Sequence, residues 1–215
     1  MKKGTLTVRI GLDDTDHPDF GCTTYSFDGL MSSLSEMRGL KIIERRLVRL
    51  WPYASRRTRG NGALSAVIEI PSNSKENLLV NCKSWFDGLL SEIADYPVAE
   101  NKPSPALLVS FDVTPSDWYW EAVRGEVNLD KRVKQVIDSD IFMLSHEDKW
   151  GVIGASAAIS WVPKGNHSWE LIGWREDEKI GTERRISKKS ILEMSSLFTD
   201  TCLLYTSPSP RDTEV

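Results

Sequence analysis

Three aspartates lie within four positions, directly after a hydrophobic segment near the start of the chain. Apolar and β-branched residues dominate residues 6–12 (LTVRIGL), which is typical of a buried strand. Asp13, Asp14 and Asp16 follow at once. Like charges this close raise one another's pKa unless a cation neutralises them. The segment is therefore expected to form a strand that ends in a cation-binding turn.

Magnesium is the cation that suits this turn best. Mg²⁺ binds a few carboxylate oxygens and completes its shell with waters and substrate phosphates, and strand ends in α/β folds commonly hold such sites. A competing interpretation is that the turn caps the next helix, but a cap accounts for one acidic residue and not for three. We therefore expect Asp13, Asp14 and Asp16 to bind Mg²⁺.

Two threonines precede the first expected helix, which spans about residues 24–37 because apolar residues recur there at three- and four-residue spacing. Backbone N–H groups at a helix start can bind a phosphate, and a threonine hydroxyl there can cap the helix or act as a nucleophile. Capping is the simpler interpretation of Thr23 or Thr24 taken singly. Thr23 nevertheless becomes a candidate catalytic residue.

The rest of the chain alternates between expected strands and helices. Strands are expected at residues 41–50, 63–70, 105–113 and 169–174. Helices are expected at residues 74–94, 118–124, 129–137, 151–160 and 187–198. This alternation predicts an α/β or α+β fold, although it does not fix the order of the strands.

Arginine is concentrated in one segment of a chain whose net charge is −4. Residues 45–59 contain six arginines and no acidic residue. Guanidinium groups and glycine-exposed amides hold triphosphate oxygens, so the end of this segment is expected to bind ATP. The candidate residues are Arg57, Arg59, Gly60, Asn61 and Gly62. The alternatives are a solvated basic face balanced by acids elsewhere, and a simple Asn-Gly hairpin turn.

The sequence offers no sign of membrane insertion or secretion. No apolar run approaches the roughly 18 residues of a membrane span, and the first ten residues lack a signal-peptide core. The three cysteines are widely spaced and form no CxxC pair, which indicates reduced thiols. A cytoplasmic protein is expected.

The last fifteen residues differ from the rest. Residues 201–215 have no periodicity and contain Ser-Pro-Ser-Pro, which predicts disorder. Their CLLYTSPSPRD segment resembles a translated sequencing adapter. We therefore expect a folded region at residues 1–200 and a disordered, non-native tail that interrupts the natural chain near Asp200.

Four motifs occur in a specific order along the chain. They are residues 10–16 (IGLDDTD), 22–25 (CTTY), 46–50 (RLVRL) and 58–63 (TRGNGA). Each motif alone is weak, but their order and spacing closely resemble the archaeal tRNA(Ile) 2-agmatinylcytidine synthetase family. Residues 151–159, 170–172 and 181–182 also fit, so that the resemblance covers about residues 5–197.

The resemblance implies an ATP-dependent ligase that joins agmatine to C2 of the wobble cytidine of the isoleucine tRNA reading AUA. In this family, phosphate activates the cytosine carbonyl oxygen before the agmatine amine displaces it. The implied architecture is a kinase-like catalytic domain with an associated ferredoxin-like domain that contributes to agmatine binding, their boundary being undetermined. The family's OB-fold and zinc ribbon, which grip the tRNA, are expected to be absent from this chain.

The resemblance also implies roles for individual residues. Asp13, Asp14 and Asp16 match positions that hold magnesium and the ATP phosphates. Thr23 matches a threonine that the family phosphorylates on itself. Arg59 and residues 60–62 match the lining of the ATP site.

The chain departs from the family pattern at three places. Trp51 stands where the family usually has Asn. Arg57 stands where the family has Lys, and its planar guanidinium binds phosphate with a different geometry from that of a lysine ammonium. Residues 103–106 (PSPA) stand where the family has an Asp-Pro-Gly segment.

Two other functions remain open on the residues alone. A magnesium phosphohydrolase is one, because Asp14-Thr15-Asp16 after a strand resembles an aspartyl-phosphate motif. It lacks a convincing distal Asp-Asp and Lys set. A non-catalytic RNA-binding module that uses the arginine loop is the other, and it leaves the three carboxylates unexplained.

Overall fold

The computed structural model of the chain describes residues 4–18, 21–57, 60–99 and 101–163, together with short stretches at 184–186, 189, 192–193, 196 and 212–214. The chain divides into two compact units, Met1–Pro163 and Lys164–Val215. In the second unit, β6 (Arg184–Ile186) pairs in parallel with β7 (Asp212–Glu214).

Two expectations fall largely outside these residues. The strand at 169–174 and most of the helix at 187–198 are not described. The disordered tail stays a prediction, since only Asp212–Glu214 of it is described.

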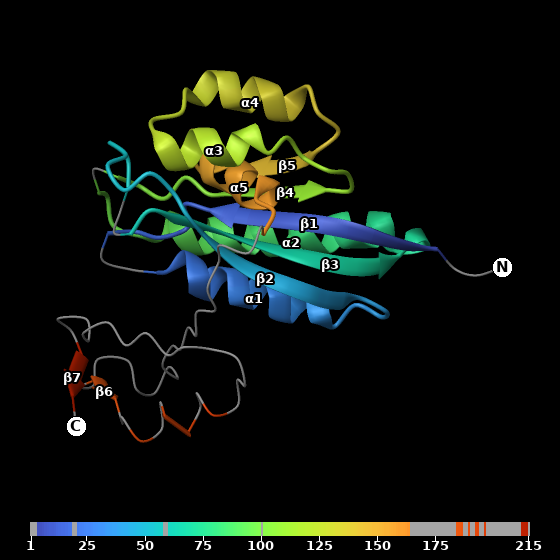
Figure 1. Cartoon of the computed structure of the whole chain (residues 1–215), viewed down its shortest axis with the longest axis horizontal. Helices are drawn as coiled ribbons and strands as arrows, with labels where there is room; N and C mark the ends of the chain where they lie inside the picture. The colour runs from blue at the N-terminus through green and yellow to red at the C-terminus, as the bar shows by residue number, and fades with distance from the viewer. Residues whose placement is uncertain are drawn as a thin grey trace. The chain divides into compact units, whose positions relative to one another are not determined.

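The first unit is a three-layer structure around an antiparallel sheet (Figure 1). Its strands are β1 (Thr5–Asp13), β2 (Lys41–Arg49), β3 (Gly62–Pro71), β4 (Ala106–Ser110) and β5 (Phe142–Ser145), in the order β2-β3-β1-β4-β5. Its helices are α1 (Thr23–Ser35), α2 (Lys75–Ala94), α3 (Asp117–Arg124), α4 (Leu129–Ile137) and α5 (Gly151–Ser160), with the short 3₁₀ helix η1 (Ser72–Ser74) before α2. Helices α1 and α2 cover one face of the sheet, and α3, α4 and α5 lie over the other.

The first four strands and two helices form two interlocked β-α-β units. Strand β3 lies between β1 and β2 and pairs antiparallel with both, so β1 and β2 are parallel and joined by α1. In the same way β1 lies between β3 and β4, which α2 joins. This split βαβ arrangement is the ferredoxin-like topology. Strand β5 extends it by pairing with the free edge of β4.

The alternation of side chains along β1 explains why the sheet is covered on both faces. Val8, Ile10 and Leu12 are fully buried in the core formed with α1 and α2. Gly11 points the other way, where an added Cβ would lie 2.5 Å from the Ala155 carbonyl oxygen and 2.7 Å from Ile159 Cγ2. The lack of a side chain at Gly11 therefore lets α5 lie directly on β1.

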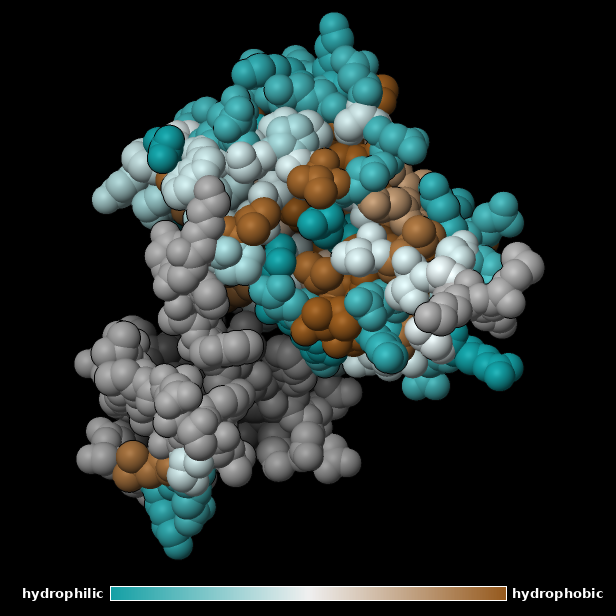
Figure 2. Space-filling view, turned by 45° about the vertical axis from the view of Figure 1, so that its right-hand side comes forward, coloured by the Kyte–Doolittle hydropathy of each residue, from teal (hydrophilic) through white to brown (hydrophobic). Residues whose placement is uncertain are grey.

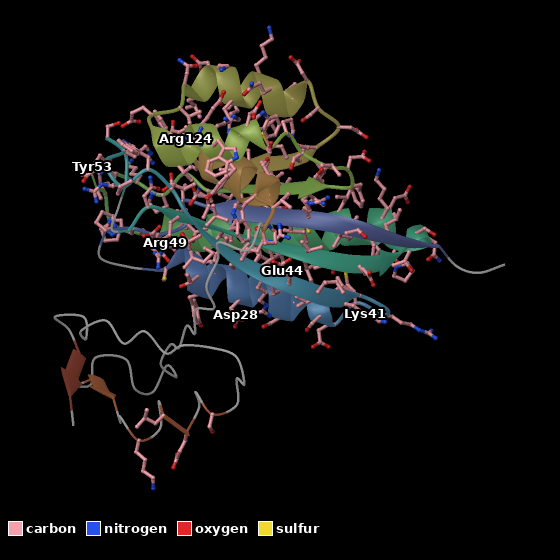
Figure 3. All side chains as sticks on the ribbon, in the orientation of Figure 1. Asp28, Lys41, Glu44, Arg49, Tyr53 and Arg124 are labelled. Carbon is pink, nitrogen blue, oxygen red and sulfur yellow. The ribbon has the colours of Figure 1, made fainter. Side chains whose placement is uncertain are left out.

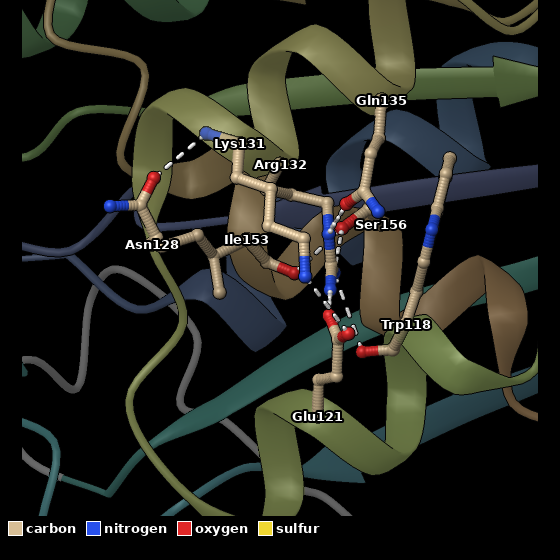
Figure 4. A network of polar contacts seen from close by, with 8 residues as sticks. All are labelled: Trp118, Glu121, Asn128, Lys131, Arg132, Gln135, Ile153 and Ser156. Carbon is tan, nitrogen blue, oxygen red and sulfur yellow. Dashed lines mark hydrogen bonds and ion pairs between the residues drawn. The ribbon is translucent and has the colours of Figure 1, made fainter.

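A buried arginine joins the three helices of the second face (Figure 4). The Arg132 side chain, on α4, is fully buried. It donates to Glu121 Oε2 at 2.5 Å and to the Trp118 carbonyl on α3, and to Ser156 Oγ on α5 at 2.9 Å. Because a buried charge is tolerated only when it is paired and hydrogen-bonded, Arg132 fixes how α3 and α4 pack on α5.

The surface of the first unit mixes hydrophobic and hydrophilic residues, and hydrophobic ones gather near the centre of one view (Figure 2). Such mixing is ordinary for globular proteins. Among the described residues, no helix combines the length and the hydropathy that crossing a membrane requires.

The expected elements of the first unit are confirmed, with two differences. Strand β4 ends at Ser110, three residues before the expected end. Strand β5 is not predicted from the sequence, because its four half-buried residues show no alternation and it forms along the unpaired edge of β4. Because every strand pair of the five-stranded sheet is antiparallel, the α+β alternative is the correct one.

The Gly11 contact predicts a sharp effect on stability. Gly11→Ala is expected to lower the free energy of unfolding by about 1–3 kcal/mol, since the new methyl group overlaps the α5 backbone. The control is Gly88→Ala on α2, where the methyl group meets nothing within 4 Å and helix propensity favours alanine by up to about 1 kcal/mol. Urea unfolding of both variants measures this, and equal effects would contradict the close approach.

Candidate functional site

The acidic turn begins where β1 ends. Asp13 is the last residue of β1 and pairs with Ala106 on β4. Asp14 then adopts a left-handed backbone conformation (φ 58°), which aspartate tolerates better than most residues. Its carbonyl accepts the Ser104 N–H at 3.1 Å. The chain therefore turns sharply at Asp14 while the preceding carboxyl stays on the sheet.

The Asp13 carboxyl packs against helix α5. An added Cβ on Gly154 would overlap its Oδ2, and one on Gly151 would lie 2.7 Å from its carbonyl oxygen. Burial raises the pKa of Asp13 well above its ordinary value, and the charges of Asp14 and Asp16 raise it further. Gly154 thus makes room for a carboxyl group that the protein stabilises poorly in its charged form, and Gly151 makes room for the backbone beside it.

Arg56 neutralises Asp14 in part. Its Nη2 donates to Asp14 Oδ2 at 3.3 Å, and both side chains are about one fifth exposed. Burial raises the pKa of Asp14 to about 6, although the Arg56 charge lowers it and the Asp16 charge raises it. Asp14 therefore changes its protonation state close to neutral pH.

A group of hydroxyls surrounds Thr23, the first residue of α1. Thr23 Oγ1 donates to Asp16 Oδ1 at 3.1 Å and accepts from the Thr15 hydroxyl at 3.3 Å. Thr15 Oγ1 also lies 3.1 Å from Ser26 Oγ. Cys22 is the N-cap residue and its side chain makes no capping bond. The capping interpretation of Thr23 is therefore wrong, because its hydroxyl faces the acidic turn.

Ser104 organises the start of α5. It is fully buried and lies in the segment that replaces the family's Asp-Pro-Gly. Its carbonyl accepts the Gly151 N–H at 2.9 Å, and its hydroxyl accepts the Trp150 N–H at 3.0 Å. Together with its bond to Asp14, these contacts join the acidic turn to the helix.

The arginine-rich loop is closed at its base by backbone contacts. Asn61 Nδ2 donates to the Trp51 carbonyl at 2.7 Å, and the Trp51 N–H donates to the Ala122 carbonyl at 2.9 Å. The Ser55 N–H donates to Glu126 Oε1 at 2.6 Å. Asn61 therefore closes the base of the loop, while Trp51 and Ser55 attach the loop to α3 and the following connection.

These segments enclose one pocket. Its walls come from the acidic turn, the loop, the connection between α3 and α4, and the first turns of α5. The expected site residues among them are Asp13, Asp14, Asp16, Arg57, Gly60, Asn61 and Gly62. Arg59 lies outside the described residues. Thr23 is not in the lining and is linked to it through Asp16.

The arginine segment divides between two roles. On β2, Arg45 pairs with Asp28 of α1, and Arg46 donates to Glu44 Oε2 and to the Trp161 carbonyl, each at 2.7 Å. This edge of the sheet, with Lys41, Glu44 and Arg49 labelled, carries charges of both signs (Figure 3). Acidic residues thus pair with Arg45 and Arg46 on β2, whereas Arg56 and Arg57 line the pocket.

Sequence reasoning missed several residues of the pocket. Arg56, Trp150, Gly154 and the connection at residues 125–127 all line it. Arg56 belongs to the basic segment but to none of the motifs, and the connection carries no motif either. Only the packing of α3 and α5 beside the loop brings these residues to the acidic turn.

The oxygen donors of the pocket suit magnesium. Among the described residues, no group of three or more His, Cys, Asp or Glu is arranged to hold a metal ion by itself. Mg²⁺ needs only one or two carboxylates when substrate phosphates and waters complete its shell. Asp13, Asp14 and Asp16 offer carboxylates toward one pocket, whose mutual repulsion a cation relieves.

The fold and the pocket define an α+β protein with a pocket lined by carboxylates, arginines and glycines. Comparison with known sequences makes this specific. The model of the TiaS TCKD domain matches residues 9–147, and that of the TiaS FLD domain matches residues 149–204. The chain therefore belongs to the TiaS family. Helix α5 falls within the second match but packs on the sheet of the first unit.

Curated relatives and solved structures agree. The isoleucine-tRNA 2-agmatinylcytidine synthetases TiaS of Methanopyrus kandleri and Methanocaldococcus jannaschii are 32% and 29% identical over 86% of this chain, and the chain covers 41% and 44% of them. A crystal structure of TiaS in complex with its isoleucine tRNA and ATP matches 91% of this chain and 45% of that one, at 27% identity and a TM-score of 0.71. A crystal structure of TiaS in complex with the tRNA, AMPCPP and agmatine matches 89% of this chain and 45% of that one, at 26% identity and a TM-score of 0.67. The chain thus spans less than half the length of these proteins.

The raised pKa of Asp14 predicts how stability depends on pH. The carboxyl titrates near pH 3.9 when unfolded and near 6 when folded, so between these values the folded state binds more protons. Without metal or nucleotide, the free energy of unfolding should therefore fall as pH rises through about 6. Urea unfolding at several pH values, compared with Asp14→Asn, isolates this contribution. Identical pH profiles for the two proteins would show that Asp14 titrates normally.

Proposed function

We propose that the chain is the catalytic part of a TiaS-type 2-agmatinylcytidine synthetase, which uses ATP and Mg²⁺ to join agmatine to C2 of the wobble cytidine of the AUA-reading isoleucine tRNA. One observation carries the proposal: in a chain of the TiaS family, one pocket collects the acidic turn and the arginine loop. We also propose that the protein is located in the cytoplasm, as expected for an enzyme that acts on tRNA.

The pocket has the groups that a nucleotide triphosphate needs. Arg57 offers a guanidinium fork, and Gly60 and Gly62 expose backbone amides beside it. The apolar walls formed by Leu50, Val127 and Ile153 suit a nucleobase better than solvent-exposed phosphates. We assign the phosphates to the loop side of the pocket, next to the acidic turn.

Magnesium would be held by one or two of the carboxylates of Asp13, Asp14 and Asp16, with phosphate oxygens and waters completing its shell, and it would neutralise phosphate charge during phosphoryl transfer. Without a cation the charged forms of these carboxyl groups are destabilised, since burial and mutual repulsion raise the pKa of both Asp13 and Asp14. Charged carboxylates are thus stabilised mainly when the ligand is present.

Thr23 is the proposed phosphoryl acceptor. Its hydroxyl already donates to Asp16 Oδ1, so Asp16 can take the proton as Oγ1 bonds to a phosphorus of ATP, while the phosphoanhydride bond to that phosphorus breaks and the rest of the nucleotide leaves. The Thr15 N–H lies 3.4 Å from Thr23 Oγ1 and helps to hold the hydroxyl in this orientation. The proposed base Asp16 thus follows β1, and the proposed acceptor Thr23 begins α1.

The alternative functions are less well supported. A phosphohydrolase does not account for the match to TiaS along residues 9–204. A non-catalytic RNA-binding module does not account for buried carboxylates that line a pocket with the loop arginines.

Asp16→Asn should slow phosphorylation of Thr23 by about 100-fold or more, because an amide cannot take the proton. Mass spectrometry of the chain incubated with ATP and Mg²⁺ measures the rate, with Thr23→Val as the blank. Thr24→Val is the matched control, since its hydroxyl contacts Cys22 Sγ instead of the acidic turn. An unchanged rate in Asp16→Asn would remove Asp16 from the reaction.

The whole reaction is tested with labelled ATP, Mg²⁺, agmatine and a transcript of the isoleucine tRNA. We expect AMP to be released and agmatine to become attached to the wobble cytidine, both dependent on Asp14. Release of phosphate from simple monoesters without AMP would instead identify a phosphohydrolase. Salt-sensitive tRNA binding without nucleotide turnover would identify an RNA-binding module.

A further inference from the structure

Arg56 bridges three segments that meet at the pocket. It belongs to the loop after β2, while Asp14 lies after β1, Lys102 lies before β4, and Trp150 lies directly before α5. Its Nη2 donates to Asp14 Oδ2 and to the Lys102 carbonyl. Its guanidinium carbon lies 5.4 Å from the centre of the Trp150 ring. The side chain is therefore fixed in the pocket wall and not spread over the surface.

The Arg56 guanidinium has N–H groups that make no described hydrogen bond. Arginine carries five N–H groups, and both described hydrogen bonds of Arg56 use Nη2. Its Nε is buried and has no hydrogen-bond partner within the described part of the chain. A buried donor left unsatisfied is costly. The pocket wall therefore contains a guanidinium whose hydrogen-bonding capacity is only partly used.

The pairing with Asp14 has a second consequence. Asp14 Oδ2 accepts from Arg56, and the same carboxylate is one of the proposed metal ligands. A cation and a guanidinium compete for one carboxylate because both draw on the same negative charge. Desolvation raises the pKa of the neighbouring Asp13 well above its ordinary value, and the like charges of Asp14 and Asp16 raise it further.

We propose that Arg56 is an exchangeable counter-charge of the acidic turn: it pairs with Asp14 in the ligand-free protein and moves to the nucleotide phosphates when metal-bound nucleotide enters. This inference rests on the proposed nucleotide site. Stacking on Trp150 keeps the guanidinium in the pocket during the exchange, and its unused N–H groups match phosphate oxygens. Arg56 thus lowers the affinity for metal alone and raises the affinity for metal with nucleotide.

The test measures two affinities of opposite expected sign. At pH 8, free Mn²⁺ is followed by electron paramagnetic resonance to obtain its affinity for the chain alone, and calorimetry gives the affinity for ATP with Mg²⁺. Arg56→Gln should bind Mn²⁺ about fivefold more tightly and ATP about fivefold more weakly, which is the scale of one partly exposed ion pair. Arg45→Gln removes an equal charge on β2, where Arg45 pairs with Asp28, and should change neither affinity.

Arg56→Lys keeps the positive charge without the planar fork. It should bind Mn²⁺ as the unaltered chain does and ATP more weakly, and it serves as the main variant if Arg56→Gln does not fold. Weaker or unchanged Mn²⁺ binding by Arg56→Gln, or unchanged ATP binding by both variants, would overturn the inference. If the unaltered chain bound neither Mn²⁺ nor ATP, the proposed function itself would fail.

Discussion

The contact between α5 and β1 determines most of the site. Helix α5 can lie on β1 because Gly11 has no side chain to separate the two backbones. Arg132 holds α3 and α4 against the same helix through Glu121 and Ser156. The contact places Gly154 beside Asp13 at the end of β1. The pocket thus follows from close backbone packing, which tolerates little change in volume.

The acidic turn illustrates a conflict between stability and function. Two partly buried carboxyl groups lie at one strand end, where desolvation disfavours their charged forms and raises their pKa values. The fold compensates in part with Arg56 and with the Thr23 hydroxyl on Asp16. Sites poised in this way are expected where a ligand supplies the missing counter-charge, because natural proteins keep local instability at functional sites.

The departures from the family pattern become understandable at particular atoms. The contacts that close the loop at residue 51 come from its backbone N–H and carbonyl, so tryptophan can stand in place of asparagine without opening the loop. Ser104 lacks the carboxylate of the family's aspartate, yet its hydroxyl still accepts the Trp150 N–H at the start of α5. Arg57 keeps a positive charge in the pocket lining.

The sequence by itself determined most strands and helices of the first unit, because hydrophobic periodicity is local, and it singled out the acidic turn by its charge density. It left both the α/β and the α+β fold classes open. It did not show the edge strand β5, which depends on a free edge of β4, and it did not show which residues lie beside the acidic turn. Arg56, Ser104 and Trp150 are 42, 90 and 136 positions away from Asp14 in the sequence. Only the tertiary structure could decide that they meet there, because such contacts follow from the pairing of β4 with β1 and from the packing of α5 on the sheet, and they leave no local pattern.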